Sequence, residues 1–194
     1  MYPAISLIAG LGNPGPEYAE TRHNAGFRFL DAVLAAFPGA RLRAEAKFSG
    51  EVGQVDVAGS KVWLLKPMTY MNHSGEAISK FANFYKIPIG QILVVHDELD
   101  LPPGTVRLKV GGGNGGHNGL TDATEKLGSP DYVRLRIGIG HPGSAPQVSS
   151  YVLKRAPVSE QELIDSAIER ARGFLLDIVQ GQHQKVMNAL HSQK

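Results

Sequence analysis

Strand-like and helix-like segments alternate along this chain, and that alternation constrains the fold more than any other feature of the sequence. The strand-like segments are short runs that are apolar or alternate between apolar and polar residues, at residues 5–9, 50–57, 61–66, 92–95, 106–110 and 132–140. The helix-like segments carry apolar residues three or four positions apart, at residues 27–37, 77–85, 120–127, 159–179 and 184–191. Such alternation predicts an α/β protein with three α/β/α layers, in which helices cover both faces of a sheet.

The connections between these segments predict how the sheet and the domain are organised. Ala58-Gly59-Ser60 joins two neighbouring strands as a hairpin, so we expect a twisted mixed sheet and not a purely parallel one. The sequence has 194 residues, no internal repeat and no clear linker, which predicts a single domain over residues 1–194. Within it we expect a mobile glycine-rich loop at 111–119 and a C-terminal helix or tail at 182–194.

Two helix starts carry recognisable signals. Asn72 or Ser74 is suited to cap the helix that follows it. The run from Ser159 to Glu162 has the pattern of a capping box, in which the two side chains satisfy each other's free backbone N–H groups. It predicts that one long helix begins there and continues through Val179.

Composition excludes several classes of protein. The chain has no cysteine, which excludes a disulfide framework, a thiolate zinc site and a cysteine nucleophile. The apolar run at 5–9 has no basic flank and is too short for a signal peptide or a membrane span, so we expect a cytoplasmic protein. The net charge of +2 does not identify a nucleic-acid binder, so basic residues must be judged where they cluster.

Polar residues near strand ends indicate acid–base chemistry. His23, Asn72 and Asp97 all lie in segments that leave the carboxyl ends of predicted strands, where α/β proteins bind ligands. A carboxylate bonded to Nδ1–H of His23 would leave its Nε2 free to take a proton. The motifs G-x-S-x-G, S-x-x-K and H-E-x-x-H are absent, which favours direct attack by water. The alternative is that His23 is a structural histidine at a helix start.

The glycine loop at 111–119 indicates a phosphate site. It follows a strand that carries Arg107 and Lys109 on one face, and it precedes a helix N-terminus, where N–H groups favour anions. Arg134 and Arg136, on one face of another strand, are expected to complete a compact basic patch. The alternative is a flexible lid or hairpin connection. Together with a histidine base, the loop predicts a hydrolase for a phosphate-bearing substrate.

Two further motifs are weaker. Residues 10–15 match G-x-G-x-x-G after a strand, as in dinucleotide-binding folds, but Pro14 and Pro16 keep the chain from turning straight into a helix. A tight loop that presents Asn13 is the simpler interpretation. The acids within 96–100 suggest a metal site, yet no second cluster of ligands accompanies them.

Several blocks of the sequence together resemble the bacterial-type peptidyl-tRNA hydrolase family, over nearly the whole chain. These blocks are GLGNPG at 10–15, TRHNAG at 21–26, KPMTYMN at 66–72, HDELD at 96–100, GGHNG at 115–119 and RLRIGIG at 134–140. The resemblance implies a monomeric cytoplasmic enzyme with a single mixed-sheet domain and no metal or other cofactor. It would cleave the ester between a peptide and the 3′-terminal ribose of tRNA. Its partner would be peptidyl-tRNA, with neither DNA nor a membrane.

The resemblance also implies roles for individual residues. His23 would be the general base, Asp97 would hold it in its basic form, and Asn13 would distinguish N-blocked peptidyl-tRNA from free aminoacyl-tRNA. The positions expected to contact the substrate are Tyr18, Tyr70, Asn72, His117 and Asn118. The positions expected to face tRNA phosphates are Arg107, Lys109 and Arg136.

The chain departs from the family pattern at three positions. Asn114 stands where family members often carry histidine, Thr121 where a basic residue is usual, and Tyr70 where phenylalanine is frequent. These changes bear on tRNA affinity more than on chemistry. A non-catalytic RNA-binding relative that serves as a splicing cofactor is the rival interpretation, and the intact pair of His23 and Asp97 argues against it.

Overall fold

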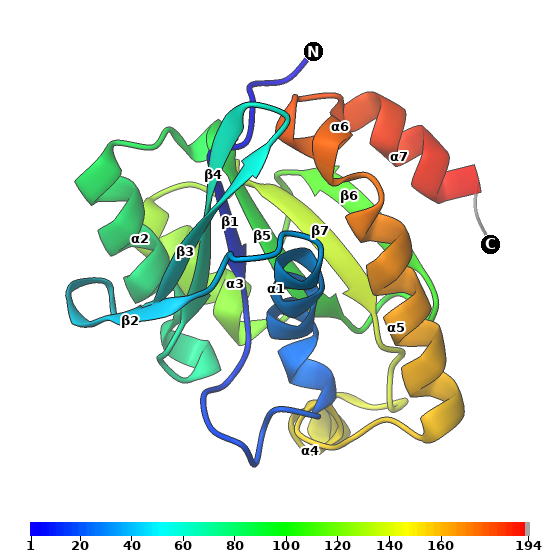
Figure 1. The fold of residues 1–194 in the computed structure, drawn as a ribbon. Coiled ribbons are helices and arrows are strands. Elements are labelled where there is room, and N and C mark those ends of the chain that lie inside the picture. Colours follow the sequence, from blue (N-terminus) through cyan, green and yellow to red (C-terminus); the bar gives the residue numbers. More distant parts are fainter. Residues whose placement is uncertain (193–194) are drawn as a thin grey trace.

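The computed structural model describes residues 1–192, and a seven-stranded mixed sheet forms its centre (Figure 1). The strands are β1 (Leu7–Gly10), β2 (Arg43–Glu45), β3 (Gly50–Val57), β4 (Ser60–Pro67), β5 (Ile92–Glu98), β6 (Val106–Val110) and β7 (Val133–Gly138). Their order in the sheet is β2-β3-β4-β1-β5-β7-β6. The central strands β4, β1, β5 and β7 are parallel, whereas β2, β3 and β6 run antiparallel to their neighbours β3, β4 and β7. The predicted hairpin and mixed sheet are confirmed.

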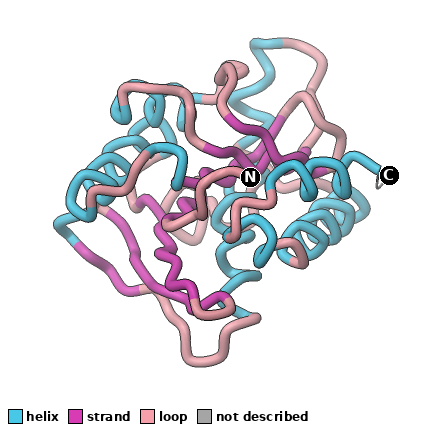
Figure 2. The backbone as a smooth tube through the Cα atoms, turned by 90° about the horizontal axis from the view of Figure 1, so that it is seen from above, coloured by secondary structure: helices cyan, strands magenta, loops and turns pink. Residues whose placement is uncertain are grey.

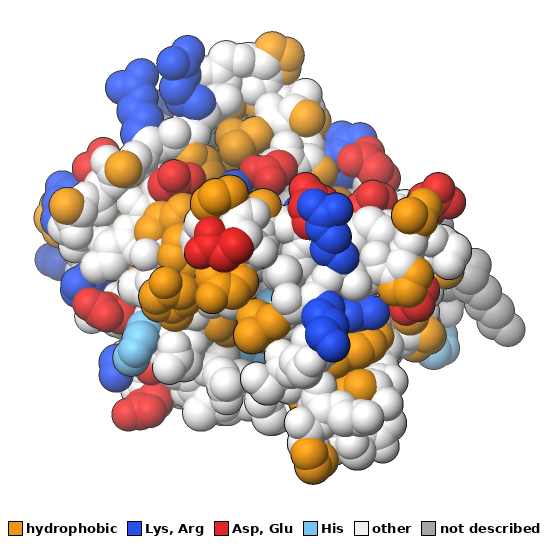
Figure 3. Space-filling view, turned by 90° about the horizontal axis from the view of Figure 1, so that it is seen from below, with side chains coloured by type: hydrophobic (Ala, Val, Ile, Leu, Met, Phe, Trp, Pro, Cys, Tyr) orange, Lys and Arg blue, Asp and Glu red, His pale blue; other side chains and the backbone are white. Residues whose placement is uncertain are grey.

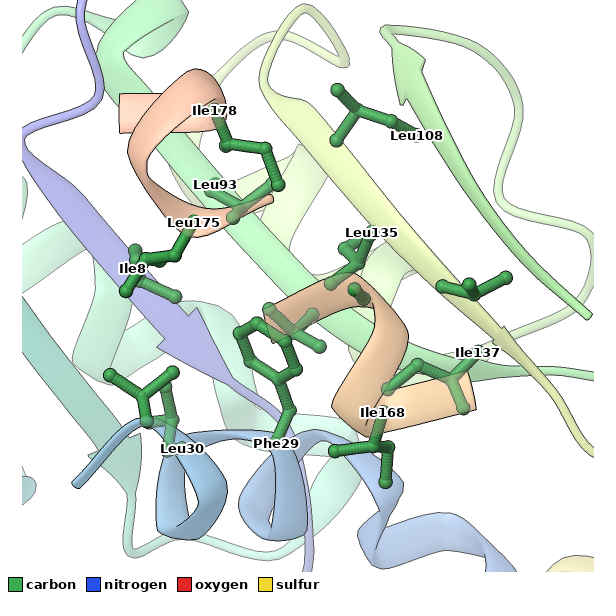
Figure 4. Packing of buried hydrophobic residues seen from close by; sticks show 14 of the residues in the cluster. Ile8, Phe29, Leu30, Leu93, Leu108, Leu135, Ile137, Ile168, Leu175 and Ile178 are labelled. Carbon is green, nitrogen blue, oxygen red and sulfur yellow. The ribbon is translucent and has the colours of Figure 1, made fainter. Parts of the chain in front are cut away.

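Helices cover both faces of the sheet, as Figures 1 and 2 show. They are α1 (Ala25–Ala35), α2 (Ser74–Tyr85), α3 (Asn118–Leu127), α4 (Val148–Val152), α5 (Val158–Arg172), α6 (Leu175–Val179) and α7 (His183–Ser192). One hydrophobic cluster joins the sheet to α1, α5, α6 and α7, and a second joins its other face to α2 and α3. Figure 4 shows side chains of α1, α5 and α6 meeting those of β1, β5 and β7 in the first cluster. The predicted α/β/α layers are therefore confirmed.

Three predicted helix details are wrong. The helix α5 begins at Val158, one residue before the proposed capping box, and Pro157 occupies the cap position. The long helix predicted through Val179 is interrupted at Gly173, where low helix propensity permits a break between α5 and α6. Neither candidate caps α2, because its cap residue is His73 and Ser74 Oγ donates to Met71 O at 2.7 Å.

The elements that the sequence patterns did not predict are short. The strand β2 has three exposed residues, and α4 has five residues with Val152 as its buried member. Neither is long enough to display a period of apolar residues, so pairing and packing with the rest of the molecule decide them. The strand β2 forms because Arg43, Ala44 and Glu45 pair with the edge of β3.

Two glycines bring the start of α1 onto the sheet. A Cβ atom on Gly26 would lie 2.4 Å from both the Leu11 backbone N and the Val95 backbone O, and one on Gly10 would lie 2.4 Å from Gly26 O. Only glycine permits backbones to approach so closely. The turn η1 (Arg22–Asn24) is consequently held at the carboxyl ends of β1 and β5, and it carries His23.

The segment before β1 is bonded to the end of α6 and the turn that follows it. Tyr2 N donates to Gly181 O at 3.0 Å, and Ile5 N donates to Val179 O at 2.9 Å. The expected tail at 182–194 consists of α7 as far as Ser192, and residues 193–194 lie outside the described part of the chain. The single-domain boundary and the mobility of the 111–119 loop stay predictions. Within residues 1–192, no helix is both long and apolar enough to cross a membrane.

Candidate active site

A buried carboxylate shared by two imidazoles lies at the carboxyl end of β5. Asp97 Oδ2 is 2.8 Å from Nδ1 of His23, and Asp97 Oδ1 is 2.8 Å from Nε2 of His117. His23 comes from the turn before α1, Asp97 from the end of β5, and His117 from the glycine loop just before α3. Asp97 is 2% exposed. Three segments far apart in the sequence therefore converge on one carboxylate.

The hydrogen bonds determine which ring nitrogens carry protons. His117 Nδ1 accepts from the backbone N–H of Leu120 at 3.3 Å, so its Nε2 carries the proton that is donated to Asp97. Because Asp97 is an acceptor when ionised, Nδ1 of His23 donates to it as well. His23 lines the cavity, and its Nε2 is left to accept a proton there.

Burial and charge act against each other at this carboxylate. Burial by itself raises the pKa of Asp97, but the neighbouring charges of His23 and His117 and their hydrogen bonds hold that pKa well below its usual range. Burial likewise lowers the pKa of His23, yet the charge and hydrogen bond of Asp97 outweigh it and raise that pKa above 6.5. The pair thus combines a permanent carboxylate with a strengthened base.

A second buried network presents an amide to the same site. Asn24 Oδ1 accepts from the Asn13 backbone N, and Asn24 Nδ2 donates to Asn13 O, both at 2.9 Å. The backbone N–H of Met71 donates to Asn13 Oδ1 at 2.6 Å. Because this contact needs the carbonyl oxygen of the side chain, Asn13 is left with its Nδ2 donor for the cavity it lines.

A cavity of about 530 Å³ brings most of the predicted site residues together. The predicted residues that line it are Asn13, His23, Tyr70, Asn72, Asp97, His117 and Asn118. Tyr18 is not among its lining residues but packs edge-on against Tyr70, with 6.2 Å between ring centroids. Apolar side chains of Val148, Val152 and Leu153 also line the cavity. Figure 3, seen from the side where β1 and β5 end, shows hydrophobic side chains gathered near the middle of this face.

A smaller hollow of about 190 Å³ adjoins the cavity and contains two of the predicted phosphate ligands. Lys109 and Arg136 line it, and Glu98 and Gly115 belong to both hollows. Arg136 Nε donates to Glu98 Oε1 at 2.9 Å. Arg107 lines neither hollow.

Two arginines are engaged inside the protein. Arg107 Nη1 donates to the backbone carbonyls of Val106 and Leu190, both at 2.9 Å, and so holds the end of α7. Arg134 is 1% exposed. It lines the smaller hollow together with Lys109 and Arg136, as expected of a compact basic patch, but its guanidinium is already bonded to backbone carbonyls of the 111–119 loop.

The geometry bears on two alternative interpretations, a dinucleotide site and a metal site. Residues 10–15 do not lead into a helix N-terminus, since α1 begins only at Ala25, so the dinucleotide interpretation fails. In the 96–100 segment, His96 Nδ1 donates to its neighbour's carbonyl, Asp97 O, and Glu98 pairs with Arg136. The ligand atoms of His23, Asp97 and His117 lie within 4.8 Å of one another, close enough to be considered for a metal ion. Hydrogen bonding accounts for both of their contacts.

Sequence reasoning missed two parts of the site. It assigned His117 to substrate contacts and did not connect it to Asp97, and it did not identify Asn24 as the residue that holds Asn13. Asn24 lies next to His23 in the TRHNAG block, so its place was recognisable. Its partner, eleven residues earlier, could not be identified by any regular spacing.

The chain is similar to known proteins over nearly its whole length. A sequence model of the family described as "Peptidyl-tRNA hydrolase" matches residues 7–194. The peptidyl-tRNA hydrolase of Pseudomonas syringae pv. tomato is 55% identical over 192 residues, which cover 98% of this chain and 98% of that protein. The peptidyl-tRNA hydrolase of Azotobacter vinelandii is 53% identical over 192 residues, again 98% of each chain. The crystal structure of peptidyl-tRNA hydrolase from Acinetobacter baumannii matches with a TM-score of 0.95 and 51% identity, covering 98% of this chain and 96% of that one.

Proposed function

The chain belongs to the peptidyl-tRNA hydrolase family, and we propose that His23 is the general base of the reaction and that Asp97 holds it. Its activity is that of an ester hydrolase that frees tRNA from peptidyl-tRNA. The single observation that carries the residue assignment is the contact of 2.8 Å between His23 Nδ1 and the buried Asp97 Oδ2. It gives the imidazole one defined tautomer and directs its basic nitrogen at the cavity.

The proposed reaction needs one water molecule and no covalent enzyme intermediate. Nε2 of His23 takes a proton from the water, whose oxygen attacks the ester carbonyl carbon. The bond between that carbon and the ribose oxygen then breaks, and the imidazolium returns its proton to the ribose oxygen. The Asp97 carboxylate stabilises the imidazolium between these two steps. A peptide acid and a tRNA with a free 3′-hydroxyl leave the site.

Side-chain amides suit a substrate whose own side chains vary. Asn13 offers Nδ2, and Asn72 and Asn118 line the same cavity. Such groups bind backbone carbonyl and N–H groups of any peptide. A donor near the reacting carbonyl would also stabilise its developing negative charge. We assign substrate contacts to these three residues and to Tyr18, Tyr70 and His117.

We assign the binding of tRNA phosphates to Lys109 and Arg136, whose hollow opens beside the cavity. Both side chains can read a phosphate without reading base identity. Arg107 was predicted for the same role. To take it, its guanidinium would have to leave the Leu190 carbonyl at the end of α7. For this residue we therefore propose a weaker contribution to tRNA affinity.

We also propose that the enzyme acts as a cytoplasmic monomer without a cofactor. All the residues assigned above come from one chain, so a second copy is not required to complete the site. The reaction needs a base, a water molecule and amide donors, which the side chains and solvent supply. Peptidyl-tRNA arises in translation, which takes place in the cytoplasm.

The test is hydrolysis of an N-acetyl-aminoacyl-tRNA compared with the same aminoacyl-tRNA unblocked, with a chelator present. We expect selective cleavage of the blocked ester, abolished in His23→Ala while folding is retained. Asn13→Ala should reduce the selectivity, because the amide that distinguishes a blocked from a free amine is gone. Unchanged turnover in His23→Ala would remove the general-base assignment. Tight tRNA binding without cleavage by the wild type would favour the RNA-binding cofactor instead.

A further inference from the structure

A buried arginine outside the proposed reaction machinery holds the glycine loop. Arg134 lies in β7, and its Nη2 donates to Gly112 O at 2.8 Å and to Pro130 O at 3.1 Å. Its Nη1 donates to Gly113 O at 2.5 Å. A planar guanidinium is the one side chain that can reach several carbonyls in fixed directions at once. Arg134 therefore clamps the loop from the sheet beneath it.

This arginine is placed where a charge is unfavourable. It is 1% exposed, and among residues 1–192 it makes no ion pair with a carboxylate. Its guanidinium carbon lies 4.4 Å from the centre of the Tyr132 ring, which offers a cation–π contact. A buried charge is tolerated where hydrogen bonds satisfy it, and here the carbonyls of Gly112, Gly113 and Pro130 accept from the two terminal nitrogens, whereas the buried Nε has no partner among the described residues. The arrangement thus ties the charge of Arg134 to one conformation of the loop.

Two further hydrogen bonds hold the loop: Gly111 N donates to Tyr132 O at 3.0 Å, and Thr124 Oγ1 donates to Asn114 Oδ1 at 3.2 Å. Gly111, Gly112, Gly115 and Gly116 all have positive φ angles, and glycine loses more conformational freedom on ordering than any other residue. Gly113 has no neighbouring atom within 4 Å of the position where a Cβ would stand. Glycines contribute no side chains to packing, so hydrogen bonds to the backbone, foremost those of Arg134 to Gly112 O and Gly113 O, order this segment.

A chain of contacts connects the clamp to the reacting base. Arg134 Nη1 lies 3.5 Å from Asn114 Oδ1, and the Asn114 backbone carbonyl accepts from the His117 backbone N–H at 2.9 Å. His117 Nε2 donates to Asp97 Oδ1, and Asp97 Oδ2 accepts from His23 Nδ1. A shift of the loop would therefore move an imidazole that shares a carboxylate with the base.

We propose that Arg134 is a positioning residue for the hydrolysis of peptidyl-tRNA. It sets the conformation of the 111–116 loop and, through Asn114, the place of His117 on Asp97. The proposal rests on the proposed function, since it takes the pair of Asp97 and His23 as the reacting machinery. Arg134 itself contacts neither water nor ester in this scheme.

The first test compares Arg134→Met with a matched variant, Arg170→Met. Arg170 is also an arginine with a buried Nε without a partner, and its Nη2 donates to a backbone carbonyl, Gly104 O, at 2.7 Å. It lies on α5, and the carbonyl that it bonds is outside the 111–119 loop. We expect both variants to lower Tm, but only Arg134→Met to lower kcat, roughly tenfold, because small misplacements of reacting groups are costly. An unchanged kcat in Arg134→Met would overturn the proposal.

The second test asks whether Arg134 acts through His117. If it does, Arg134→Met combined with His117→Ala should have the kcat of His117→Ala alone, because the imidazole to be positioned is already absent. A loss of kcat that does not pass through His117 would instead multiply with the effect of His117→Ala. Multiplying effects for Arg134→Met would overturn the proposal.

A second variant and a hydrogen-exchange measurement keep the proposal testable if Arg134→Met does not fold. Should Arg134→Met fail to fold, Arg134→Lys replaces it in the same cycle, because lysine keeps the charge but not the planar set of donors. Hydrogen exchange of the amides at 111–117 reports on the clamp without any reaction, and it should accelerate in the Arg134 variants only. Unchanged exchange overturns the clamp. Faster exchange together with full activity of His23→Ala would instead show that the proposed function is wrong.

Discussion

Two segments deliver the polar groups of the cavity, and they are held in place by different means. The turn with His23 is locked by backbone packing, since Gly10 and Gly26 let α1 contact the strand ends directly. The loop before His117 has no such packing, and hydrogen bonds from the buried Arg134 hold it. One site thus combines a part fixed by close backbone packing with a part fixed by polar contacts. The part held by polar contacts, the glycine loop, can rearrange at a lower cost in free energy.

The largest loss of activity should follow from replacing Asp97, the residue that both segments contact. Asp97→Asn removes the charge that orients His23 and one of the two acceptors that its oxygens provide. We expect kcat to fall by about 10³- to 10⁴-fold, as when a carboxylate that sets a histidine tautomer is lost. The matched control is Asp122→Asn. The Asp122 carboxylate is also buried and accepts from Gly75 N at 2.8 Å, but it does not line the cavity. A kcat loss confined to Asp122→Asn would contradict the assignment.

A pair of glycine substitutions tests the comparison itself. An added methyl group in Gly26→Ala would collide with backbone atoms at 2.4 Å, whereas one in Gly113→Ala meets nothing within 4 Å. We expect Gly26→Ala to lower the free energy of unfolding by about 3 kcal/mol or more, because backbone cannot give way like a side chain. Gly113→Ala should change it by no more than about 0.5 kcal/mol. Urea denaturation measures both, and equal losses would refute the distinction.

The pH dependence should report on the segment with His23. This imidazole must be neutral to accept a proton, and Asp97 raises its pKa above 6.5 despite burial. We therefore expect kcat/KM to fall as the pH drops through a midpoint above 6.5. Titration of the His23 ring by NMR should give the same midpoint, and Asp97→Asn should lower it. A midpoint that stays unchanged in Asp97→Asn would show that another group controls it.

The smallest expected effect is a difference in KM between variants of two basic residues on β6. Lys109 is exposed and lines the smaller hollow, whereas Arg107 is engaged with the end of α7. We expect Lys109→Ala to raise KM roughly fivefold and to make it less sensitive to salt, because a phosphate contact is lost. Arg107→Ala should raise KM less and mainly loosen α7, visible as faster hydrogen exchange there. A larger KM effect for Arg107→Ala would mean that its guanidinium leaves α7 to reach tRNA.

Local patterns predicted the elements better than their ends. The hairpin after Val57 and the helix that begins near Asn118 were predictable because apolar period and turn residues agree there. The break at Gly173 was not, because apolar residues continue at helical spacing on both sides of it. Whether a helix continues through such a glycine depends on the surface against which it packs.

The amino-acid sequence alone was sufficient for the α/β/α architecture, the family, and the choice of His23, Asp97 and the asparagines as the polar groups of one site. Those conclusions depend on periodicity and on residue types in ordered blocks, which are local properties of the chain. Only the tertiary structure decided that Asp97 serves two imidazoles, that Asn24 holds Asn13, and that Arg134 is buried beneath the glycine loop. Each of these contacts joins separate segments, and their geometry depends on strand order and helix packing that no local pattern encodes.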